Sequence, residues 1–399
     1  MAATQRPLMI GWMPSNRGGA VRPARAQPHW WALPVLILGA LVLVALAAMA
    51  VENAQRTAGW GFDFRAYYDG AIRLIATGSP YQSDTLRGPF QPGPAGLYLY
   101  SPVPALLMVP LTWLGLANAT LVWLLLRLGL LFATCLLMPV PRWVKLATLC
   151  VAVLSAQFLY DLNLGNVSLI VTFFAVVAWR WLDEPIGALA VAASLTIRPT
   201  MAVIAGWWAL RRKWQMVAWV IIGAAAIFLA TLPFMGLDPW LQFVTVLRNV
   251  SDTTGVTRNL DLAATAATLG VPAQLADLFL VGGYILALGA ILLSLRRDRE
   301  IGFAVTLMAS LLLAPLLWDH YLTNLIVPGA LLAARGRRFG VLLPLLGWLP
   351  LVMLPFVVIL AMFLPFTVPD RGVAALELGA VEPEPIADTD AGLRGAAGG

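Results

Sequence analysis

Long apolar stretches separated by short polar or basic segments run along most of the 399-residue chain. The first covers residues 31–51 and exceeds the apolar core of about 7–15 residues in a secretory signal peptide, so we expect an uncleaved helix. Further apolar segments cover residues 103–140, 146–159, 167–181, 187–210, 216–233, 273–295, 301–318, 322–334 and 340–366. Because a membrane-spanning helix needs about 20 mainly apolar residues, the pattern predicts an all-α polytopic membrane protein, a bundle of about ten to twelve transmembrane helices.

Basic residues gather between the apolar segments, as is typical of cytoplasmic loops. The clusters are Arg142/Lys145, Arg211-Arg212-Lys213, residues 296–299 and residues 335–338. We expect all of them, and the basic segment 1–30, on the cytoplasmic side. This requires that residues 103–140 cross once, with a shallow first part, and that residues 187–210 form a hairpin broken at Arg198-Pro199, because proline stops a helix.

Under this topology the polar segments emerge together on the outer face. They are a large first outer loop at residues 52–101, residues 160–166, residues 234–272 and the corner at 318–321. A second topology, with two full crossings in each long segment, would put Asp161 inside and Asp63 outside. The first is preferred because it satisfies the Arg142/Lys145 cluster. Residues 31–367 then form one membrane domain, and the tail 368–399 has too little apolar surface to fold, so we expect it to be disordered.

Composition strengthens the membrane interpretation. The chain is 60% hydrophobic and 12% charged, with a mean hydropathy of +0.82, whereas a soluble domain is roughly 25% charged. The net charge of +6 comes from the clusters between apolar segments, so we expect no nucleic-acid partner. Only two cysteines occur, both in apolar stretches, and there is no zinc-ligand spacing, Walker loop or Gly-rich dinucleotide motif. We therefore expect neither a metal nor a cofactor.

The first outer loop carries the densest candidate chemistry. Charged and aromatic groups alternate in it before a short amphipathic helix, as in a segment at the headgroup boundary; the candidates are Asp63, Arg65, Tyr67, Tyr68, Tyr81 and Tyr100. In a purely structural interpretation Asp63 is a loop or cap residue and the tyrosines are interfacial anchors.

Two further groups of polar residues adjoin apolar helices. Asp161, Asn163 and Asn166 precede a helix expected to begin near residue 167; capping explains one or two of them, and substrate binding is the alternative. Arg198 stands alone in an apolar stretch, which makes it a functional-site hypothesis, with snorkelling as the structural alternative. A guanidinium near the outer surface suits the phosphate of a lipid carrier.

A last corner places Asp319, His320 and Tyr321 between two apolar helices. His320 is either an interface residue or, with its neighbours, a contact for a sugar or phosphate.

Together these motifs resemble a known family. Six short motifs occur in the family's order: Asp63-Phe64-Arg65-Ala66-Tyr67-Tyr68, Gly78-Ser79-Pro80-Tyr81, Tyr98-Leu99-Tyr100-Ser101-Pro102, Gly165-Asn166, Ile197-Arg198-Pro199-Thr200 and Asp319-His320-Tyr321. The set resembles the membrane glycosyltransferases of the GT-C type, specifically glycosyltransferase family 87, which includes phosphatidylinositol-mannoside α-mannosyltransferases. Gly165-Asn166 stands where Gly-Gln is common in that family, and Arg198 where Lys is common.

The resemblance implies transfer of a sugar, mannose first and arabinofuranose as the alternative, from a polyprenyl-phosphate donor to a glycolipid or glycan acceptor. It implies a multi-pass protein of the cytoplasmic membrane, surrounded by membrane lipids, with its site facing outside. Asp63 takes the place of the family's catalytic base, and a cation such as Arg198 would stabilise the departing phosphate without a metal. A secondary transporter would also have a broken helix and intramembrane charges, but no clear internal repeat is present. A non-enzymatic scaffold of envelope assembly is the third interpretation.

Overall fold

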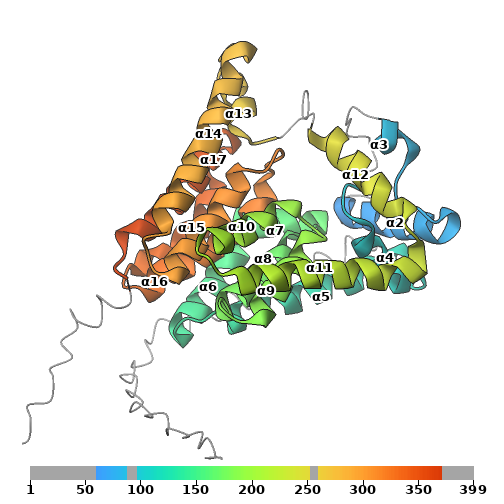
Figure 1. The fold of residues 1–399 in the computed structure, drawn as a ribbon, viewed down its shortest axis with the longest axis horizontal. Coiled ribbons are helices and arrows are strands. Elements are labelled where there is room, and N and C mark those ends of the chain that lie inside the picture. The colour runs from blue at the N-terminus through green and yellow to red at the C-terminus, as the bar shows by residue number, and fades with distance from the viewer. Residues whose placement is uncertain (1–59, 88–96, 252–258, 371–399) are drawn as a thin grey trace, which may run out of the picture.

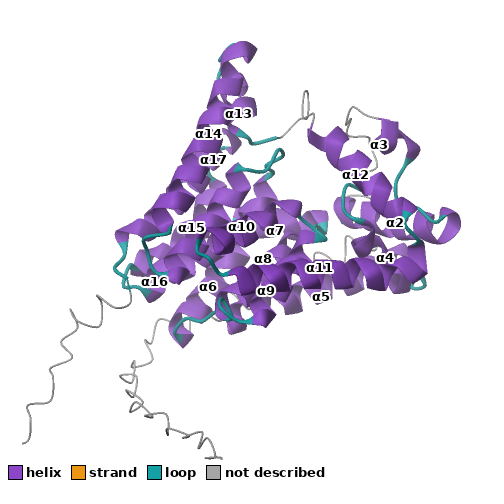
Figure 2. Cartoon of the chain, viewed as in Figure 1, coloured by secondary structure: helices purple, strands orange, loops and turns teal. Residues whose placement is uncertain are grey.

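The structure is a computed structural model that describes residues 60–87, 97–251 and 259–370, and every regular element in these ranges is a helix (Figure 2). The predicted segment 1–30, the first apolar helix at 31–51 and the tail from residue 371 lie outside the described residues. The α-helices are α2 (Phe62–Thr77), α3 (Ser83–Arg87), α4 (Pro102–Thr112), α5 (Gly115–Leu137), α6 (Arg142–Leu154), α7 (Ala156–Leu164), α8 (Ser168–Arg180), α9 (Pro185–Leu195), α10 (Ala202–Leu210), α11 (Trp214–Met235), α12 (Asp238–Ser251), α13 (Leu262–Thr268), α14 (Ala273–Ser294), α15 (Arg299–Leu312), α16 (Ile326–Ala334) and α17 (Leu354–Phe363). Short 3-10 helices are η1 (Pro199–Met201), η2 (Asp319–Leu325), η3 (Arg338–Trp348), η4 (Leu351–Met353) and η5 (Leu364–Thr367).

The chain is an all-α polytopic membrane protein, as predicted. Among the described residues, α5, α11 and α14 are long and apolar enough to cross a membrane singly, and α6 with α7 form a fourth candidate span bent by 63°. The other apolar helices have 10–17 residues, because Pro, Gly and polar residues interrupt the apolar segments. The count of about ten to twelve crossings stays a prediction.

Two predicted interruptions are confirmed. Residues 103–140 divide into the 11-residue α4 and the 23-residue α5, as the single-crossing topology requires. The hairpin break also lies where it was predicted: α9 ends at Leu195, Arg198 is extended (φ −137°, ψ 104°), and η1 begins at Pro199. Proline disfavours helical backbone in the residue before it, which explains the conformation of Arg198.

The predicted polar loops are more helical than expected. Residues 160–164 belong to α7, and the segment 234–272 contains the amphipathic α12 and the short α13. Helix α12 packs on the first loop, where Asn249 donates a hydrogen bond to the Thr85 carbonyl (2.9 Å). Figure 1 shows α2, α3, α4 and α12 grouped on one side of the bundle, with α13 and α14 on the other. The first group has its own small apolar core, which includes Phe64, Tyr98 and Val246.

Two of the basic clusters, residues 211–213 and residues 296–299, lie together at one end of the bundle. The Asp183 carboxylate contacts Lys213 (3.5 Å) and Arg299 (2.5 Å), and Arg211 donates to the Arg297 carbonyl (3.2 Å). These ion pairs and this hydrogen bond join the loops after α8, α10 and α14. The three loops therefore share one face of the bundle. A common face is what the positive-inside interpretation requires.

The start of the predicted tail is part of this face. Val368 is buried, and Arg297 forms an ion pair with Asp370 (3.2 Å) while donating to the Phe366 carbonyl (2.9 Å). The boundary at residue 368 stays a prediction, and residues 368–370 contact Arg297 of the α14–α15 loop.

Thiol labelling tests the orientation. Both native cysteines are buried, so single introduced cysteines can be read against a low background. We expect Arg212→Cys to be labelled by a membrane-impermeant maleimide only from the cytoplasmic side, and Leu237→Cys to be labelled in intact cells, because basic clusters resist translocation. Labelling of position 212 in intact cells would contradict the orientation.

Candidate active site

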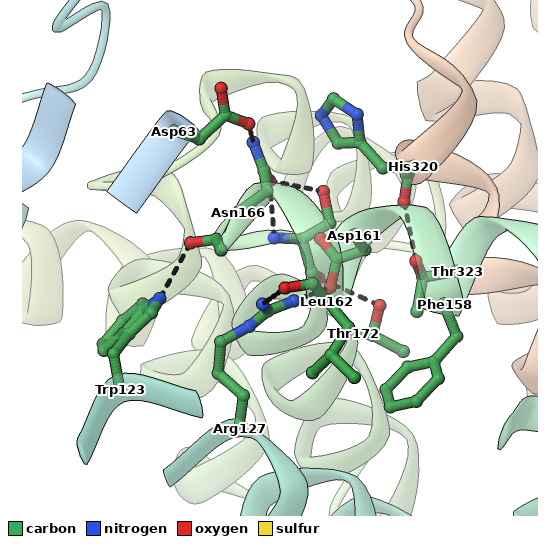
Figure 3. Close-up of polar contacts among 12 residues, drawn as sticks. Asp63, Trp123, Arg127, Phe158, Asp161, Leu162, Asn166, Thr172, His320 and Thr323 are labelled. Atoms are coloured by element: carbon green, nitrogen blue, oxygen red, sulfur yellow. Dashed lines mark hydrogen bonds and ion pairs between the residues drawn. The ribbon is translucent and has the colours of Figure 1, made fainter. Parts of the chain in front are cut away.

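Four segments that are distant in sequence meet where helices begin or break. They are the first turn of α2, the α7–α8 turn, the break before η1 and the start of η2. Their side chains include Asp63, Asn166 and His320, which Figure 3 shows, and Arg198; all four are predicted site residues.

Asp63 lies in the first turn of α2 and is half-buried. The helix begins after Gly61, whose φ is 78° and whose N–H donates to the Asn163 carbonyl (2.8 Å). Asp63 is not the N-cap residue of α2, so the capping interpretation of this carboxyl is wrong. Its Oδ2 accepts a hydrogen bond from Asn166 Nδ2 at 2.6 Å.

A glycine makes this approach of α2 to the α7–α8 turn possible. Gly165 has φ 70°, in the left-handed region, and a Cβ there would lie 2.7 Å from Phe64 Cβ. Another residue would therefore push the first turn of α2 away from Asn166. Glycine at position 165 therefore allows Asn166 to reach Asp63.

The carboxyl of Asp63 is a stronger base than an exposed aspartate. Burial raises its pKa, while the neighbouring His320 ring and the Asn166 hydrogen bond lower it by less. A raised pKa lets a carboxylate take up a proton more readily at neutral pH, provided that it starts ionised.

Three consecutive hydrogen bonds connect Asp63 to Arg198. Arg198 Nη2 donates to Ser168 Oγ (2.9 Å), Ser168 Oγ donates to Asn166 Oδ1 (2.8 Å), and Asn166 Nδ2 donates to Asp63. Asn166 also accepts a hydrogen bond from the Ser168 N–H (2.8 Å), so local capping explains part of its conformation but not its bond to Asp63. The Asp63 carboxylate and the Arg198 guanidinium thus belong to one hydrogen-bond network, in which Asn166 and Ser168 lie between them.

Arg198 is buried and does not snorkel to the surface. Its guanidinium carbon lies 3.4 Å from the centroid of the Tyr321 ring, an arrangement that stabilises a desolvated cation. Within the described structure, Nε and Nη1 have no hydrogen-bond partner. Two unsatisfied donors on a fixed cation are suited to an anionic ligand.

The Trp318 corner completes the site. His320 is buried, its ring stacks on Trp318 (5.7 Å between centroids), and its Nδ1 lies 3.5 Å from Asp319 Oδ1. Tyr100 faces this corner from the first loop, where its hydroxyl accepts hydrogen bonds from Asn166 (3.2 Å) and Tyr67 (3.1 Å). Burial raises the pKa of both tyrosines, so they stay neutral.

Asp161 has a different place from the one predicted. It is fully buried in α7, where it forms an ion pair with Arg127 of α5 rather than lining an outer loop. Arg127 also donates to the Leu162 carbonyl (3.2 Å), and Trp123, one turn earlier, donates to the Gly165 carbonyl (2.7 Å). This face of α5 therefore fixes the turn that presents Asn166.

Sequence reasoning missed Arg127, although the signal was available. It is a lone arginine inside an apolar helix, the same argument that singled out Arg198. The difference lies in pairing: Arg127 has a carboxylate partner, whereas the described contacts of Arg198 are to a hydroxyl and a ring.

The remaining predicted residues lie around the centre rather than in it. Arg65 is exposed and pairs with Asp69 (3.6 Å); the Tyr68 and Tyr81 hydroxyls donate to the carbonyls of Thr112 (3.2 Å) and Tyr100 (2.8 Å). Asn163 lines a cleft beside the site, together with Asp319. In the described part of the chain, no group of three or more His, Cys, Asp or Glu side chains could hold a metal ion.

Comparison with known proteins adds one match. The model of glycosyltransferase family 87 matches residues 98–318, more than half of the chain. The curated proteins and the solved structures give no match. The matched region contains Asn166 and Arg198, whereas Asp63 and His320 lie outside it.

The buried ion pair between Arg127 and Asp161 predicts how substitutions change the free energy of unfolding. Arg127→Met should destabilise the protein by about 3–5 kcal/mol, because it leaves the Asp161 charge buried and unpaired. The double variant Arg127→Met/Asp161→Leu should recover part of that loss, since no charge remains. Thermal unfolding of the purified protein in lipid nanodiscs measures both; a double variant less stable than Arg127→Met alone would contradict the assignment.

Proposed function

We propose that this chain, which belongs to glycosyltransferase family 87, transfers a sugar from a polyprenyl-phosphate carrier to a hydroxyl of a lipid or glycan acceptor on the outer face of the cytoplasmic membrane. The observation that carries the proposal is the hydrogen-bonded series from Arg198 to Asp63. It provides a base and a phosphate-binding cation at fixed positions in one site. Family membership favours an enzyme over the transporter and scaffold interpretations.

Asp63 is the proposed general base. Its carboxylate takes the proton of the acceptor hydroxyl as that oxygen bonds to the anomeric carbon of the donor sugar. The bond from the anomeric carbon to the phosphate oxygen breaks, and the carrier phosphate leaves with the electron pair. The His320 ring and the Asn166 hydrogen bond favour the charged form of this carboxylate and so oppose the effect of burial on its pKa.

Arg198 is the proposed site for the carrier phosphate. Negative charge grows on the departing phosphate, and a buried cation with two unused donors stabilises that charge. The Ser168 hydroxyl and the Tyr321 ring orient the guanidinium so that it need not reorganise during the reaction. This arrangement supplies the charge compensation from the chain's own side chains.

The arrangement of charges supports the proposed outer location. The basic face joins the loops after α8, α10 and α14, whereas the site involves the first loop and the opposite ends of α8 and α9. If the basic face is cytoplasmic, the site opens outside, where polyprenyl-phosphate sugars rather than nucleotide sugars are the available donors. Mannose is the first donor to test, by resemblance, and arabinofuranose is the alternative.

Asp63→Asn tests the base. Asparagine is nearly isosteric but cannot take the proton, so transfer should fall by about 10²–10⁴-fold while donor binding is retained. Turnover is measured with purified protein in nanodiscs, a radiolabelled polyprenyl-phosphate mannose or arabinofuranose, and a native lipid extract as acceptor.

Asp69→Asn, in the same helix but paired with exposed Arg65, is the matched control and should turn over at the wild-type rate. If Asp69→Asn loses transfer activity while Asp63→Asn retains it, Asp63 is not the base.

Arg198→Ala tests the phosphate site. Loss of charged hydrogen bonds of roughly 1.5–3 kcal/mol should raise the KM for the donor about tenfold to hundredfold. Arg198→Lys should keep part of the affinity, because a point charge replaces a fork. Steady-state kinetics at limiting donor measure this; an Arg198→Ala protein with the wild-type donor KM would show that the phosphate binds elsewhere.

A further inference from the structure

A groove of about 480 Å³ lies at the basic face of the bundle, between η3, α17 and η5. Helix α16 runs from η2, at the candidate site, to the basic loop 335–338, and the groove lies beside the loop end of α16. This loop belongs to the basic face because Arg335 contacts Asp298 of the α14–α15 loop (2.8 Å). None of the catalytic steps proposed above uses the groove.

Two glycines hold η3 close to α16 and so shape one wall of the groove. A Cβ at Gly340 would lie 2.4 Å from Leu332 Cβ, and a Cβ at Gly329 would lie 2.9 Å from the Gly340 carbonyl oxygen. Glycine is the residue that permits such a close approach. Because η3 is held against α16, its side chains face α17 across the groove rather than filling the space between them.

The length of the groove is apolar. Leu332 and Leu343 are buried and form its floor, whereas Leu342 of η3 and Leu360 of α17 are exposed and form its rims. Exposed apolar side chains beside a concave surface mark a site for an apolar ligand or for the membrane. In a protein that spans a bilayer, a hydrocarbon chain is the ligand that such a groove fits.

One end of the groove has the residues of the membrane–water boundary. Phe339 lines the groove, is 87% exposed and directly follows the basic loop 335–338. Aromatic and basic side chains next to each other are typical of segments that lie at the level of the lipid headgroups. A lipid with its chain in the groove would therefore have its headgroup beside this loop.

The carboxylates around this loop already have cationic partners. Asp298 and Glu300 each contact Arg335 at 2.8 Å, and Asp370 contacts Arg297 at 3.2 Å. These ion pairs use the charges of Arg335 and Arg297. They leave the other two arginines of the 335–338 loop as the cations that face the groove and the headgroup region.

Those two cations are Arg337 and Arg338. Both are exposed, and among the residues that the structure describes no ion pair joins either of them to a carboxylate. Arg337 lines the groove, and its Nη2 donates a hydrogen bond to the Thr367 carbonyl (3.4 Å), which holds the side chain across the groove's end. The remaining guanidinium donors suit the oxygens of a phosphate.

We infer that this groove binds an anionic phospholipid of the leaflet at the basic face, with one acyl chain between η3 and α17 and its phosphate at Arg337. The inference does not depend on the proposed glycosyl transfer. Hydrocarbon chains pack about as well in the bilayer as against a protein, so the headgroup decides which lipid is retained. A zwitterionic lipid has the same phosphate but also an ammonium group, which the two arginines repel.

Photo-crosslinking of the full-length protein in phosphatidylcholine nanodiscs tests the site. The probes are phosphatidylglycerol and phosphatidylcholine with the same acyl chains, each with a diazirine at the end of one chain, and mass spectrometry locates the labelled peptides. Helix α14, whose Leu278 and Ile285 are exposed, is the internal reference for bulk lipid. We expect the ratio of phosphatidylglycerol to phosphatidylcholine labelling to be about tenfold higher on η3 and α17 than on α14, because each arginine favours an anionic headgroup.

Three variants separate the charge from the groove. Arg337→Gln/Arg338→Gln should lower the ratio on η3 and α17 to that on α14. Arg212→Gln removes an exposed cation from the same face without touching the groove and should keep the wild-type ratio. Leu360→Trp keeps both arginines but narrows the groove, so it should lower phosphatidylglycerol labelling of η3 while labelling of α14 stays the same.

Thermal unfolding in a non-ionic detergent distinguishes a lipid from a free phosphate. Phosphatidylglycerol should raise the Tm of the wild type but not of Arg337→Gln/Arg338→Gln, since a ligand stabilises the state that binds it. Glycerol 3-phosphate, the headgroup without chains, should leave the Tm unchanged. Equal protection by glycerol 3-phosphate would overturn the inference, because the apolar groove would then have no part in binding.

Two results of the labelling would also overturn it. One is a wild-type ratio on η3 and α17 equal to that on α14, or a ratio unchanged in Arg337→Gln/Arg338→Gln. The other is the absence of phosphatidylglycerol from η3 together with chemical cross-links between η3 and the acidic segment 371–399, which would assign the groove to the chain's own tail.

Discussion

Backbone polar groups inside a membrane protein must find partners within the protein, and this constraint decides where the site can form. A helix satisfies its own backbone, so each break needs a donor or acceptor from another segment. At the α7–α8 turn the Gly165 carbonyl accepts from Trp123 (2.7 Å). At the α9 break the Thr196 carbonyl accepts from the Ser101 hydroxyl. The third break, before η2, is satisfied at Leu317, whose N–H donates to an asparagine side chain in the 259–261 segment (3.1 Å).

The partners of the second and third breaks come from segments that connect the apolar helices, and the partner of the first comes from α5. The hydrogen bond that fixes each break therefore also attaches a neighbouring loop or helix to that break. The loops are part of the site's framework, and Asn166, Arg198 and His320 lie at the breaks because irregular backbone is tolerated there. The same requirement brings the first turn of α2, and with it Asp63, against the α7–α8 turn.

The sequence predicted those features that depend on local chemistry. The break at Arg198 follows from Pro199 alone, and the apolar periodicity of residues 115–137 is enough to predict α5. It could not predict that Asp161 pairs with Arg127, since both residues read as isolated charges and their contact joins positions 34 residues apart. It also assigned residues 234–272 to a loop, although Trp240, Phe243 and Val246 of α12 recur at helical spacing; what the sequence could not predict is that α12 packs on the first loop.

The two buried arginines show why pairing decides the role of an intramembrane charge. Arg127 and Asp161 neutralise each other, so neither has charge to offer a substrate, and their pair serves to hold two helices in register. Asp63 and Arg198 are instead separated by two neutral groups, Asn166 and Ser168, each of which donates toward the acid and accepts from the side of the cation. Had the acid and the cation met directly, the Coulomb attraction would have lowered the basicity of the carboxylate and occupied the guanidinium donors. The intervening amide and hydroxyl keep both charges in one network and leave each free to act on a different part of the substrates, the acid on a hydroxyl and the cation on a phosphate.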